Sequence, residues 1–413
     1  MISANEAKNI IIDSTILLDP EKVCLIDSIN RFSSEDIKTK INLPLWDNSS
    51  MDGFAFKLKE NFELKNESVN QFKIVGSLFP GDSYLPKIKD GEAIKIMTGA
   101  PIPYGANCVI PIENAKTFEI EDSSYVLFTT EPKLGNNIRR KGSDFIIGEN
   151  IISVGQKIRP YDIAKLAANG IAVIKVYSRP KISILATGNE LVKPGMKLNK
   201  HTIYDSNSLS IASMVKEAGG IPNIIGIAKD EISSIEANLR NALDSDAIIC
   251  SAGVSVGDRD YIKDVIEDQG KINFWAVNIQ PGKPFLYSHI QGRGKSIPFF
   301  GLPGNPVSVM VLMIKYVIPS IIKMQGDNNI HPKTIIAKLD EQIVNNSKRN
   351  MFARVKVKNI DGKLIASPYQ NHSSHIISSF SESNGLANVP ENCKILKAGA
   401  EVEVEVFDNS NIL

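Results

Sequence analysis

The sequence has few cysteines: four occur in 413 residues, and no two of them are close together. Zinc sites and redox motifs use closely spaced cysteine pairs, so neither is predicted. The N-terminal stretch MISANEAKNIIIDST places Glu6 and Lys8 where a signal peptide needs an apolar core. We therefore expect a protein of the reducing cytoplasm.

The sequence also lacks an excess of charge of either sign. The formal net charge of +1 creates no general attraction for nucleic acid or for an anionic membrane. The most apolar long segment, Val307 to Lys323, is interrupted by Lys315 and Pro319, which favours a kinked, buried helix over a membrane span. Neither nucleic acid nor a membrane is an expected partner, and a charged ligand must be recognised locally.

The length of 413 residues exceeds one ordinary core, so several domains are expected. Residues 1–45 are predicted to be mainly helical, starting with a capping box at Ser3 and Glu6. Together with residues 138–177 they would form a split leading domain. Residues 46–137 contain short apolar runs separated by glycine and proline, which predicts an inserted β-rich domain.

From residue 178 to residue 327 apolar strands alternate with amphipathic helices. This alternation predicts a doubly wound, mostly parallel α/β domain, in which ligands bind beyond the carboxyl ends of the strands. Residues 328–413 return to strands and include Asp361-Gly362 as a hairpin turn, so a C-terminal β-domain is expected there.

Acidic side chains follow the strands of the α/β region. Glu190, Asp230 and Asp260 are each expected near a strand end, and the topology would gather them at one edge of the sheet. Carboxylates there can hold Mg²⁺, which bridges protein acids to substrate phosphates. Capping of a following helix remains an alternative for Asp230, as it does for Asp205.

The loop after Cys250 has almost no side chains, so an anion could approach its backbone N–H groups. The candidate phosphate-binding residues are Ser251, Gly253, Ser255 and Gly257, together with Asp205 and Asn207 at the start of an expected helix. Tight turns alone would also explain the two glycines.

Two further segments would supply a second wall of this site. Lys283 lies between Pro281 and Pro284 and suits a point-charge contact to an oxyanion. Pro303 and Asn305 precede a helix whose N-terminus favours an anion, although a rigid structural turn is the alternative.

The inserted region contributes a dense group of hydroxyl and carboxyl side chains. Asp52 and Thr98 belong to this group, and both fall on expected turns. Turn residues of this kind need no further function, but the grouping is denser than one turn requires.

Eight segments occur in order between about residue 40 and residue 310: DNSSMDGFAF, IMTGAPIPYGAN, NIRRKGSD, ATGNELVKPG, IYDSN, SAGVSVGDRDY, PGKP and GLPGNPVS. Together they resemble the molybdopterin molybdenumtransferase family, the molybdenum insertases related to the E domain of gephyrin. The segment SHIISSFSESNG continues the resemblance near the C-terminus.

This resemblance implies a homodimer of four-domain subunits, with the site between the α/β domain of one subunit and the inserted domain of its partner. It implies a reaction that joins molybdate to adenylylated molybdopterin and releases AMP, with Mg²⁺ as the metal. The adenylyltransferase of the preceding step and apo-molybdoenzymes are the protein partners to expect.

By the same resemblance, functional roles fall on six side chains. Glu190, Asp230 and Asp260 would hold the metal or position the substrate. Lys283 would contact the oxyanion, and Asp52 and Thr98 would be the contribution of the inserted domain.

The chain departs from the family pattern in a few places. Ala276 and Gln280 stand where some members carry lysines, and Ala252 and Asn189 replace a commoner glycine and aspartate. Two alternative functions remain: a molybdopterin adenylyltransferase, which shares the α/β domain, and a non-catalytic scaffold like gephyrin.

Overall fold

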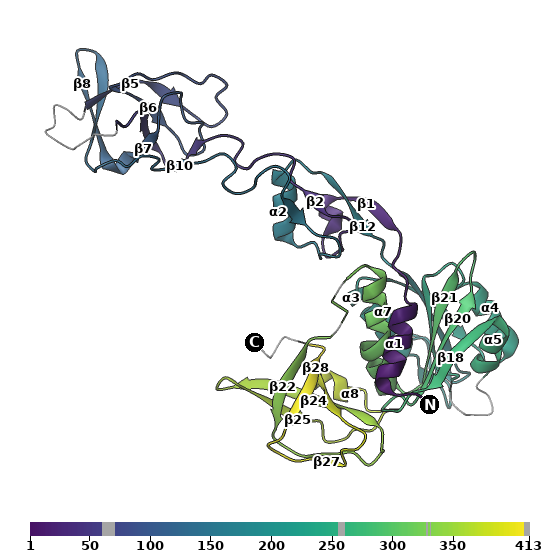
Figure 1. The fold of residues 1–413 in the computed structure, drawn as a ribbon. Helices are drawn as coiled ribbons and strands as arrows, with labels where there is room; N and C mark the ends of the chain where they lie inside the picture. Colours follow the sequence, from purple (N-terminus) through teal and green to yellow (C-terminus); the bar gives the residue numbers. More distant parts are fainter. Residues whose placement is uncertain (60–70, 255–260, 328, 331, 409–413) are drawn as a thin grey trace. The chain divides into compact units, whose positions relative to one another are not determined.

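The computed structural model describes residues 1–59, 71–254, 261–327, 329–330 and 332–408 (Figure 1). Contacts between backbone segments divide the chain into two compact units. The first comprises residues 1–35, 154–158 and 174–413, and the second comprises residues 36–153 and 159–173.

The second unit contains the six-stranded sheet of the β-rich region. Its strand order is β7-β4-β6-β5-β9-β8. The strands are β4 (Gly53–Phe56), β5 (Gln71–Leu78), β6 (Glu92–Ile96), β7 (Cys108–Pro111), β8 (Ala115–Ile120) and β9 (Ser123–Phe128). Phe56 packs against Phe72 and Phe128, with ring centroids 4.8 and 4.4 Å apart, and this aromatic cluster fills the core on one face. Burial of such large apolar rings stabilises the module.

The same unit includes two short strand pairs and one helix. β3 (Asn48–Ser49) pairs with β10 (Ile138–Arg139), and β2 (Ile37–Lys38) pairs with β11 (Asn150–Ile152). The helix α2 (Pro160–Ala168) is followed by Gly170 at φ +70°, a left-handed conformation that ends helices.

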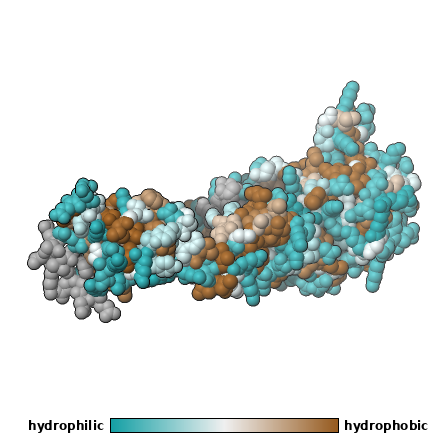
Figure 2. All heavy atoms as spheres, turned by 90° about the horizontal axis from the view of Figure 1, so that it is seen from above, coloured by the Kyte–Doolittle hydropathy of each residue, from teal (hydrophilic) through white to brown (hydrophobic). Residues whose placement is uncertain are grey.

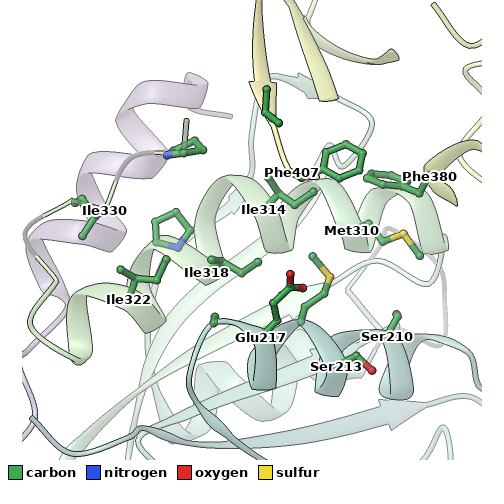
Figure 3. Close-up of a pocket in the computed structure, with 15 residues that line it drawn as sticks. Ser210, Ser213, Glu217, Met310, Ile314, Ile318, Ile322, Ile330, Phe380 and Phe407 are labelled. Carbon is green, nitrogen blue, oxygen red and sulfur yellow. The ribbon is translucent and has the colours of Figure 1, made fainter. Parts of the chain in front are cut away.

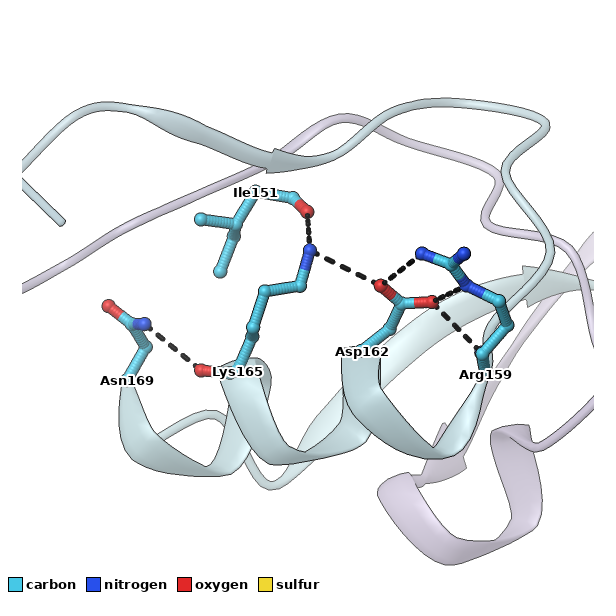
Figure 4. A network of polar contacts seen from close by, with 5 residues as sticks. All are labelled: Ile151, Arg159, Asp162, Lys165 and Asn169. Atoms are coloured by element: carbon cyan, nitrogen blue, oxygen red, sulfur yellow. Dashed lines mark hydrogen bonds and ion pairs between the residues drawn. The ribbon is translucent and has the colours of Figure 1, made fainter. Parts of the chain in front are cut away.

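Helix α2 begins with an ion-pair network around a buried carboxylate (Figure 4). The Asp162 carboxylate is fully buried and accepts hydrogen bonds from the Arg159 backbone N–H and side-chain Nε at 3.0 and 2.9 Å. Lys165 Nζ lies 3.2 Å from Asp162 Oδ1 and also donates to the Ile151 carbonyl at 3.0 Å. Burial alone would raise the pKa of Asp162, but these hydrogen bonds and charges lower it to about 2.

Asp162→Asn is expected to lower the local unfolding free energy of α2 by about 2 kcal/mol at pH 7. Because the pKa of Asp162 is depressed in the folded state, its contribution is complete above pH 3.8 and is lost as the pH falls toward 2. Hydrogen exchange of the α2 amides at pH 5 and pH 3 measures this: the difference between the two proteins should shrink by about 1 kcal/mol. A difference that is independent of pH would contradict the prediction. The control Asp90→Asn removes two exposed ion pairs, with Lys57 and Lys59, and should leave the exchange of the α2 amides unchanged.

The first unit contains a second six-stranded sheet with order β16-β13-β17-β21-β20-β18. Its strands are β13 (Lys181–Thr187), β16 (Ile221–Ala228), β17 (Ala247–Ser251), β18 (Gly270–Ala276), β20 (Pro284–Gln291) and β21 (Ser296–Leu302). β16, β13, β17 and β21 are parallel, whereas β20 and β18 add an antiparallel edge. The predicted doubly wound, mostly parallel α/β fold is confirmed.

Helices cover both faces of this sheet. The bounds are α1 (Ala4–Ser14), α3 (Asn207–Glu217), α4 (Ile232–Arg240), α5 (Ile262–Gln269), α6 (Pro306–Leu312) and α7 (Ile318–Met324). Apolar side chains of α1, α3, α6 and α7 share one core with the sheet, and those of α4 and α5 share another. Two buried faces explain why the strands are almost continuously apolar.

The prediction of mainly helical structure for residues 1–45 is wrong beyond Ser14. Ser3 caps α1 as predicted, since its side chain accepts a hydrogen bond from the Glu6 N–H at 3.2 Å. After α1 the chain forms β1 (Pro20–Cys24), a 3₁₀ turn and β2. β1 pairs with β12 (Val173–Tyr177), about 150 residues along the chain, and such non-local pairing overrides local helix preference.

One helix in the described residues, Pro306–Met324, is long and apolar enough to cross a membrane, but most of it is buried. It is a core helix, as the sequence predicts. The expected kink at Pro319 is replaced by a different irregularity. A π-helical segment, Met313–Val317, separates α6 from α7, and Pro319 lies in the first turn of α7.

On the face shown in Figure 2, polar side chains alternate with apolar patches.

The C-terminal region forms a third six-stranded sheet, β19-β24-β25-β22-β28-β26, which an additional β24–β26 pairing closes. The strands are β19 (Ile279–Gln280), β22 (Thr334–Leu339), β24 (Asn350–Ile360), β25 (Lys363–Pro368), β26 (Gly385–Val389) and β28 (Glu401–Val406). Asp361 and Gly362 form the predicted hairpin turn, with φ of +50° and +79°. The region also contains a short helix, α8 (Ser378–Ser381), that the strand pattern does not predict.

An apolar cavity of about 520 Å³ lies between α3, the Pro306–Met324 helix and the C-terminal region (Figure 3). Met310, Ile314 and Ile318 line it from the helix, and Phe380 and Phe407 line it from the C-terminal region. The two phenylalanine rings contact each other with centroids 5.3 Å apart.

Candidate functional site

Polar side chains of three strand-end loops meet at the carboxyl edge of the α/β sheet. β13, β17 and β21 are parallel and end at Thr187, Ser251 and Leu302. Asn207, the first residue of α3, donates from Nδ2 to Ser251 Oγ and to the Gly304 carbonyl, both at 2.9 Å. The structure therefore brings together Asn207 and Ser251, as the sequence predicts for a shared edge.

Several buried polar atoms at this edge have unused hydrogen-bonding capacity. In the described part of the chain, Thr187 Oγ1 and Asn207 Oδ1 are buried without a hydrogen-bond partner. Buried polar atoms are nearly always satisfied in folded proteins, so orphan atoms need an explanation. A polar ligand bound at the carboxyl edge would satisfy both atoms.

The position of Gly253 requires a left-handed backbone conformation and leaves no room for a side chain. Its φ is +74°, and a Cβ there would lie 2.7 Å from Thr187 Oγ1 and 2.8 Å from Ile262 Cγ1. The preceding Ala252 has the same φ, which is unfavourable for a residue with a side chain. The loop is further fixed by Trp275 Nε1, which donates to the Val254 carbonyl at 2.8 Å.

Ala252→Gly is expected to raise the free energy of unfolding by about 0.5–1 kcal/mol, because the strain of the left-handed conformation exceeds the added flexibility of the unfolded chain. Gly253→Ala should lower it by about 1–3 kcal/mol, because the new Cβ collides with Thr187 and Ile262. Calorimetric melting temperatures of the two variants measure both effects. A Gly253→Ala variant as stable as the wild type would contradict the expected collision with Thr187 and Ile262.

The predicted acidic residues differ in their surroundings. The buried Asp205 accepts a hydrogen bond from the Ser208 N–H at 3.0 Å, so it caps α3, the alternative that its sequence position left open. Asp230 Oδ2 instead accepts from the Asn189 N–H at 3.1 Å, and the Asp230 N–H donates to Asn189 Oδ1 at 3.4 Å. Asp230 is therefore joined to the loop that follows β13 rather than capping α4.

Glu190 lies on the same loop. Its carboxylate folds back over Gly188, where a hypothetical Cβ would be 2.8 Å from Glu190 Oε2. Asp260, Ser255 and Gly257 lie outside the described residues. Within the described ranges no group of three His, Cys, Asp or Glu side chains could hold a metal ion. Glu190 and Asp230 supply the hard oxygen donors that suit Mg²⁺, but they form only part of a metal site.

Lys283 is exposed in the loop between β19 and β20. Its carbonyl accepts from the Val277 N–H at 3.0 Å, and the Gln280-Pro281 peptide bond that precedes it is cis. Gln280 pairs with Met351 of β24, so this loop lies beside the C-terminal sheet. Gln280 Oε1 is another buried atom that has no partner among the residues described.

The helix start at Pro303 and Asn305 is less open than the sequence suggests. Pro303 is buried, and Asn305 is the residue before α6. The Val307 N–H in the first turn of α6 donates to the Ser374 carbonyl at 3.2 Å. This N–H is therefore already used within the chain, and the contact places Ser374 of the C-terminal region at the start of α6.

Arg354 is a functional candidate that the sequence reasoning missed. It lies on β24, is fully buried, and donates from Nη2 to the carbonyls of Asn371 and Ser373 at 3.0 and 3.3 Å. In the part of the chain that the structure describes, its Nε and Nη1 have no hydrogen-bond partner, and no carboxylate acts on its charge. Burial lowers the pKa of Arg354 to about 10, so it still carries its charge at neutral pH.

His372 lies close to this guanidinium. Burial and the charge of Arg354 lower the pKa of His372 to about 4, so the ring is neutral at pH 7. Its Nδ1 is also buried and unpartnered in the described structure. A buried cation with free N–H groups, next to a neutral ring, is an arrangement that an anion would complete.

The other predicted site residues belong to the second compact unit. Asp52 Oδ1 accepts hydrogen bonds from the backbone N–H and the hydroxyl of Thr98, both at 2.7 Å. These two bonds, the backbone one first, lower the pKa of Asp52, so its carboxylate is ionised at neutral pH. Asp47 similarly accepts from the Lys141 N–H and from Arg140. The structure therefore brings Asp52 and Thr98 together although 46 residues separate them.

Comparison with known families matches three models in chain order. They are described as the MoeA N-terminal region (domain I and II), a probable molybdopterin binding domain, and the MoeA C-terminal region (domain IV). The matched residues are 2–170, 183–323 and 337–407.

Curated proteins and solved structures match over nearly the full length. A molybdopterin molybdenumtransferase from Haemophilus influenzae is 32% identical over 402 residues, which are 94% of each chain. One from Nostoc sp. is 30% identical over 98% of this chain and 93% of its own. The crystal structure of a molybdopterin biosynthesis MoeA protein from Pyrococcus horikosii covers 99% of this chain and 100% of its own, with a TM-score of 0.85 at 29% identity. By this full-length similarity, the chain belongs to the molybdopterin molybdenumtransferase family.

Proposed function

We propose that this protein is an enzyme of molybdenum cofactor biosynthesis that transfers molybdate to adenylylated molybdopterin and releases AMP. The observation that carries the proposal is the group of buried, unpartnered polar atoms around the strand-end loops and the adjoining C-terminal sheet: Thr187 Oγ1, Asn207 Oδ1, Gln280 Oε1, and Nε and Nη1 of Arg354. Such a group suits a substrate that combines a pyrophosphate with an oxyanion.

Each part of the site has a chemical role in this proposal. The phosphates of the substrate approach the loop at Ser251 and Gly253, which Asn207 braces against Gly304. In this proposal two cations hold the oxyanion, the exposed point charge of Lys283 and the buried guanidinium of Arg354. Donors placed where negative charge accumulates stabilise the cleavage of a phosphoanhydride bond.

A magnesium ion fits the donor set of the strand-end loops. Glu190 and Asp230 would bind it with oxygen atoms, together with Asp260, which the sequence places at the same edge. When bound, the ion would neutralise charge on the phosphates and polarise the phosphoanhydride. The chain's own contribution is to orient the Asp230 carboxylate, which accepts a hydrogen bond from the Asn189 N–H, while the Asp230 N–H donates to Asn189 Oδ1.

The homodimer is also part of the proposal. In this proposal Asp52 and Thr98 of one subunit serve the strand-end loops of its partner, as the family resemblance implies. The hydrogen bonds of Thr98 hold one oxygen of Asp52 and leave the charged carboxylate exposed, which suits a contact to substrate or metal. We propose the cytoplasm as the location, in line with the expected reducing environment.

The test is AMP release by the purified protein given adenylylated molybdopterin and Mg²⁺, with and without molybdate. Molybdate-dependent release, with reconstitution of a cofactor-free molybdoenzyme, supports the proposal. Formation of the adenylate from ATP and bare molybdopterin would identify an adenylyltransferase instead. Substrate binding without any turnover would leave the scaffold alternative.

A further inference from the structure

The middle of the Pro306–Met324 helix contains an irregular turn that carries a charged residue. Lys315 lies in the π-helical segment Met313–Val317, and its side chain is only 11% exposed. It forms an ion pair with Glu405 of β28, and its Nζ lies 4.3 Å from the centroid of the Phe352 ring on β24. Single π-helical turns inside α-helices are rare and frequently occur at functional sites.

This ion pair is costly to bury. Glu405 is 15% exposed, and its Oε2 has no hydrogen-bond partner in the described residues. Burial lowers the pKa of Lys8 on α1, and the nearby charge of Lys315 lowers it further. Replacing a buried ion pair with neutral groups is often neutral or stabilising, so stability alone does not explain the pair.

The pair holds the strand that carries Arg354. Phe352 and Arg354 are two residues apart on β24, so they point to the same face of the strand, about 7 Å apart. Arg354 in turn holds residues 371–373, and the next residue, Ser374, accepts a hydrogen bond from Val307 at the start of α6. The C-terminal sheet is therefore attached to one helix at two points, with Arg354 between them.

We infer that Lys315, Glu405 and Phe352 form a positioning clamp that fixes β24 against the helix and so aims the free N–H groups of Arg354 at the oxyanion. The π-helical turn orients Lys315 toward β24 and β28. This inference rests on the proposed function, because the oxyanion is the ligand that Arg354 would receive.

The test compares the double variant Lys315→Met/Glu405→Gln with Lys315→Arg. The double variant removes both charges of the pair together, so it should keep a melting temperature close to that of the wild type. Its KM for molybdate should rise about tenfold, which corresponds to about 1.4 kcal/mol, with the KM for adenylylated molybdopterin unchanged. Lys315→Arg, which retains the pair, should stay within about threefold of the wild-type value. The inference is overturned if the molybdate KM is unchanged or if both KM values rise equally.

The matched control is Lys295→Met/Asp246→Asn, which removes another ion pair of the same unit. The amide oxygen introduced by Asp246→Asn would still accept the hydrogen bond from the Lys181 N–H, and both KM values should be unchanged. A second readout needs no turnover: hydrogen exchange in the first turn of α6, where Val307 is bonded to Ser374, should accelerate only in the clamp variant. If the wild type shows no molybdate-dependent release, the proposed function fails, and this exchange measurement still decides whether the clamp exists.

Discussion

Arg354→Met is expected to lower molybdate-dependent AMP release by about a hundredfold or more, the effect of removing a preorganised charged donor from an active site. The stability of this variant should be within about 1 kcal/mol of the wild type or higher, because a buried unpaired charge is itself destabilising. Loss of the two bonds to the Asn371 and Ser373 carbonyls works in the opposite direction. Single-turnover AMP release and calorimetry measure the two quantities.

Arg31→Met provides the contrast for this result. Arg31 is also buried, but it is paired with Glu21 and donates to the Tyr177 carbonyl at 2.7 Å. We expect this variant to lose about 1–3 kcal/mol of stability while the folded protein keeps its activity. If Arg354→Met instead loses stability and keeps its turnover, Arg354 is a structural residue and the oxyanion must be held elsewhere.

Asp52→Asn is expected to reduce AMP release by about a hundredfold without unfolding the protein. The asparagine oxygen can still accept from the Thr98 N–H, so the turn is retained while the negative charge is removed. Asp82→Asn is the matched control, because Asp82 accepts a backbone hydrogen bond from Phe79 at 2.8 Å in a turn of the same sheet region. Its activity should be that of the wild type, and near-normal release by Asp52→Asn would remove Asp52 from the mechanism.

Mixing the two inactive variants tests the shared site of the proposed homodimer. If the inserted region of one subunit serves the strand-end loops of its partner, a dimer of one Asp52→Asn and one Arg354→Met subunit contains one intact site. After random exchange half of the dimers are mixed, so about a quarter of the wild-type activity should return. No recovery, with exchange shown by differently tagged subunits, would place both residues in a site within one subunit.

Much of the α/β region could be predicted because its pattern is local. Alternating apolar strands and amphipathic helices predict a parallel sheet, and parallel strands bring their carboxyl ends to one edge. Asn207, Ser251 and the Asn189–Asp230 pair lie where that rule places them. Asp205 shows the limit of the rule, because position alone could not separate a ligand from the helix cap that the structure reveals.

Residues 15–45 could not be predicted in the same way. Their local preference is ambiguous, and the pairing of β1 with β12 depends on a partner far along the chain. Strand formation there follows from the hydrogen bonds and burial that this partner provides, which no local window of sequence contains.

Taken by itself, the sequence determined the family and the acids and glycines of the strand-end loops, because these follow from motifs that occur in a fixed order. It also determined the α/β fold, because apolar strands and amphipathic helices alternate along the chain. Only the tertiary structure decided that Arg354 belongs to the candidate site. On β24 it shares a strand face with Lys356 and Lys358, which are exposed, so the sequence suggests one more surface cation. On that face Phe352 and Arg354 are both buried, and the carbonyls of Asn371 and Ser373 accept hydrogen bonds from Arg354. Burial without a counter-ion is what makes this arginine a candidate for binding an anion.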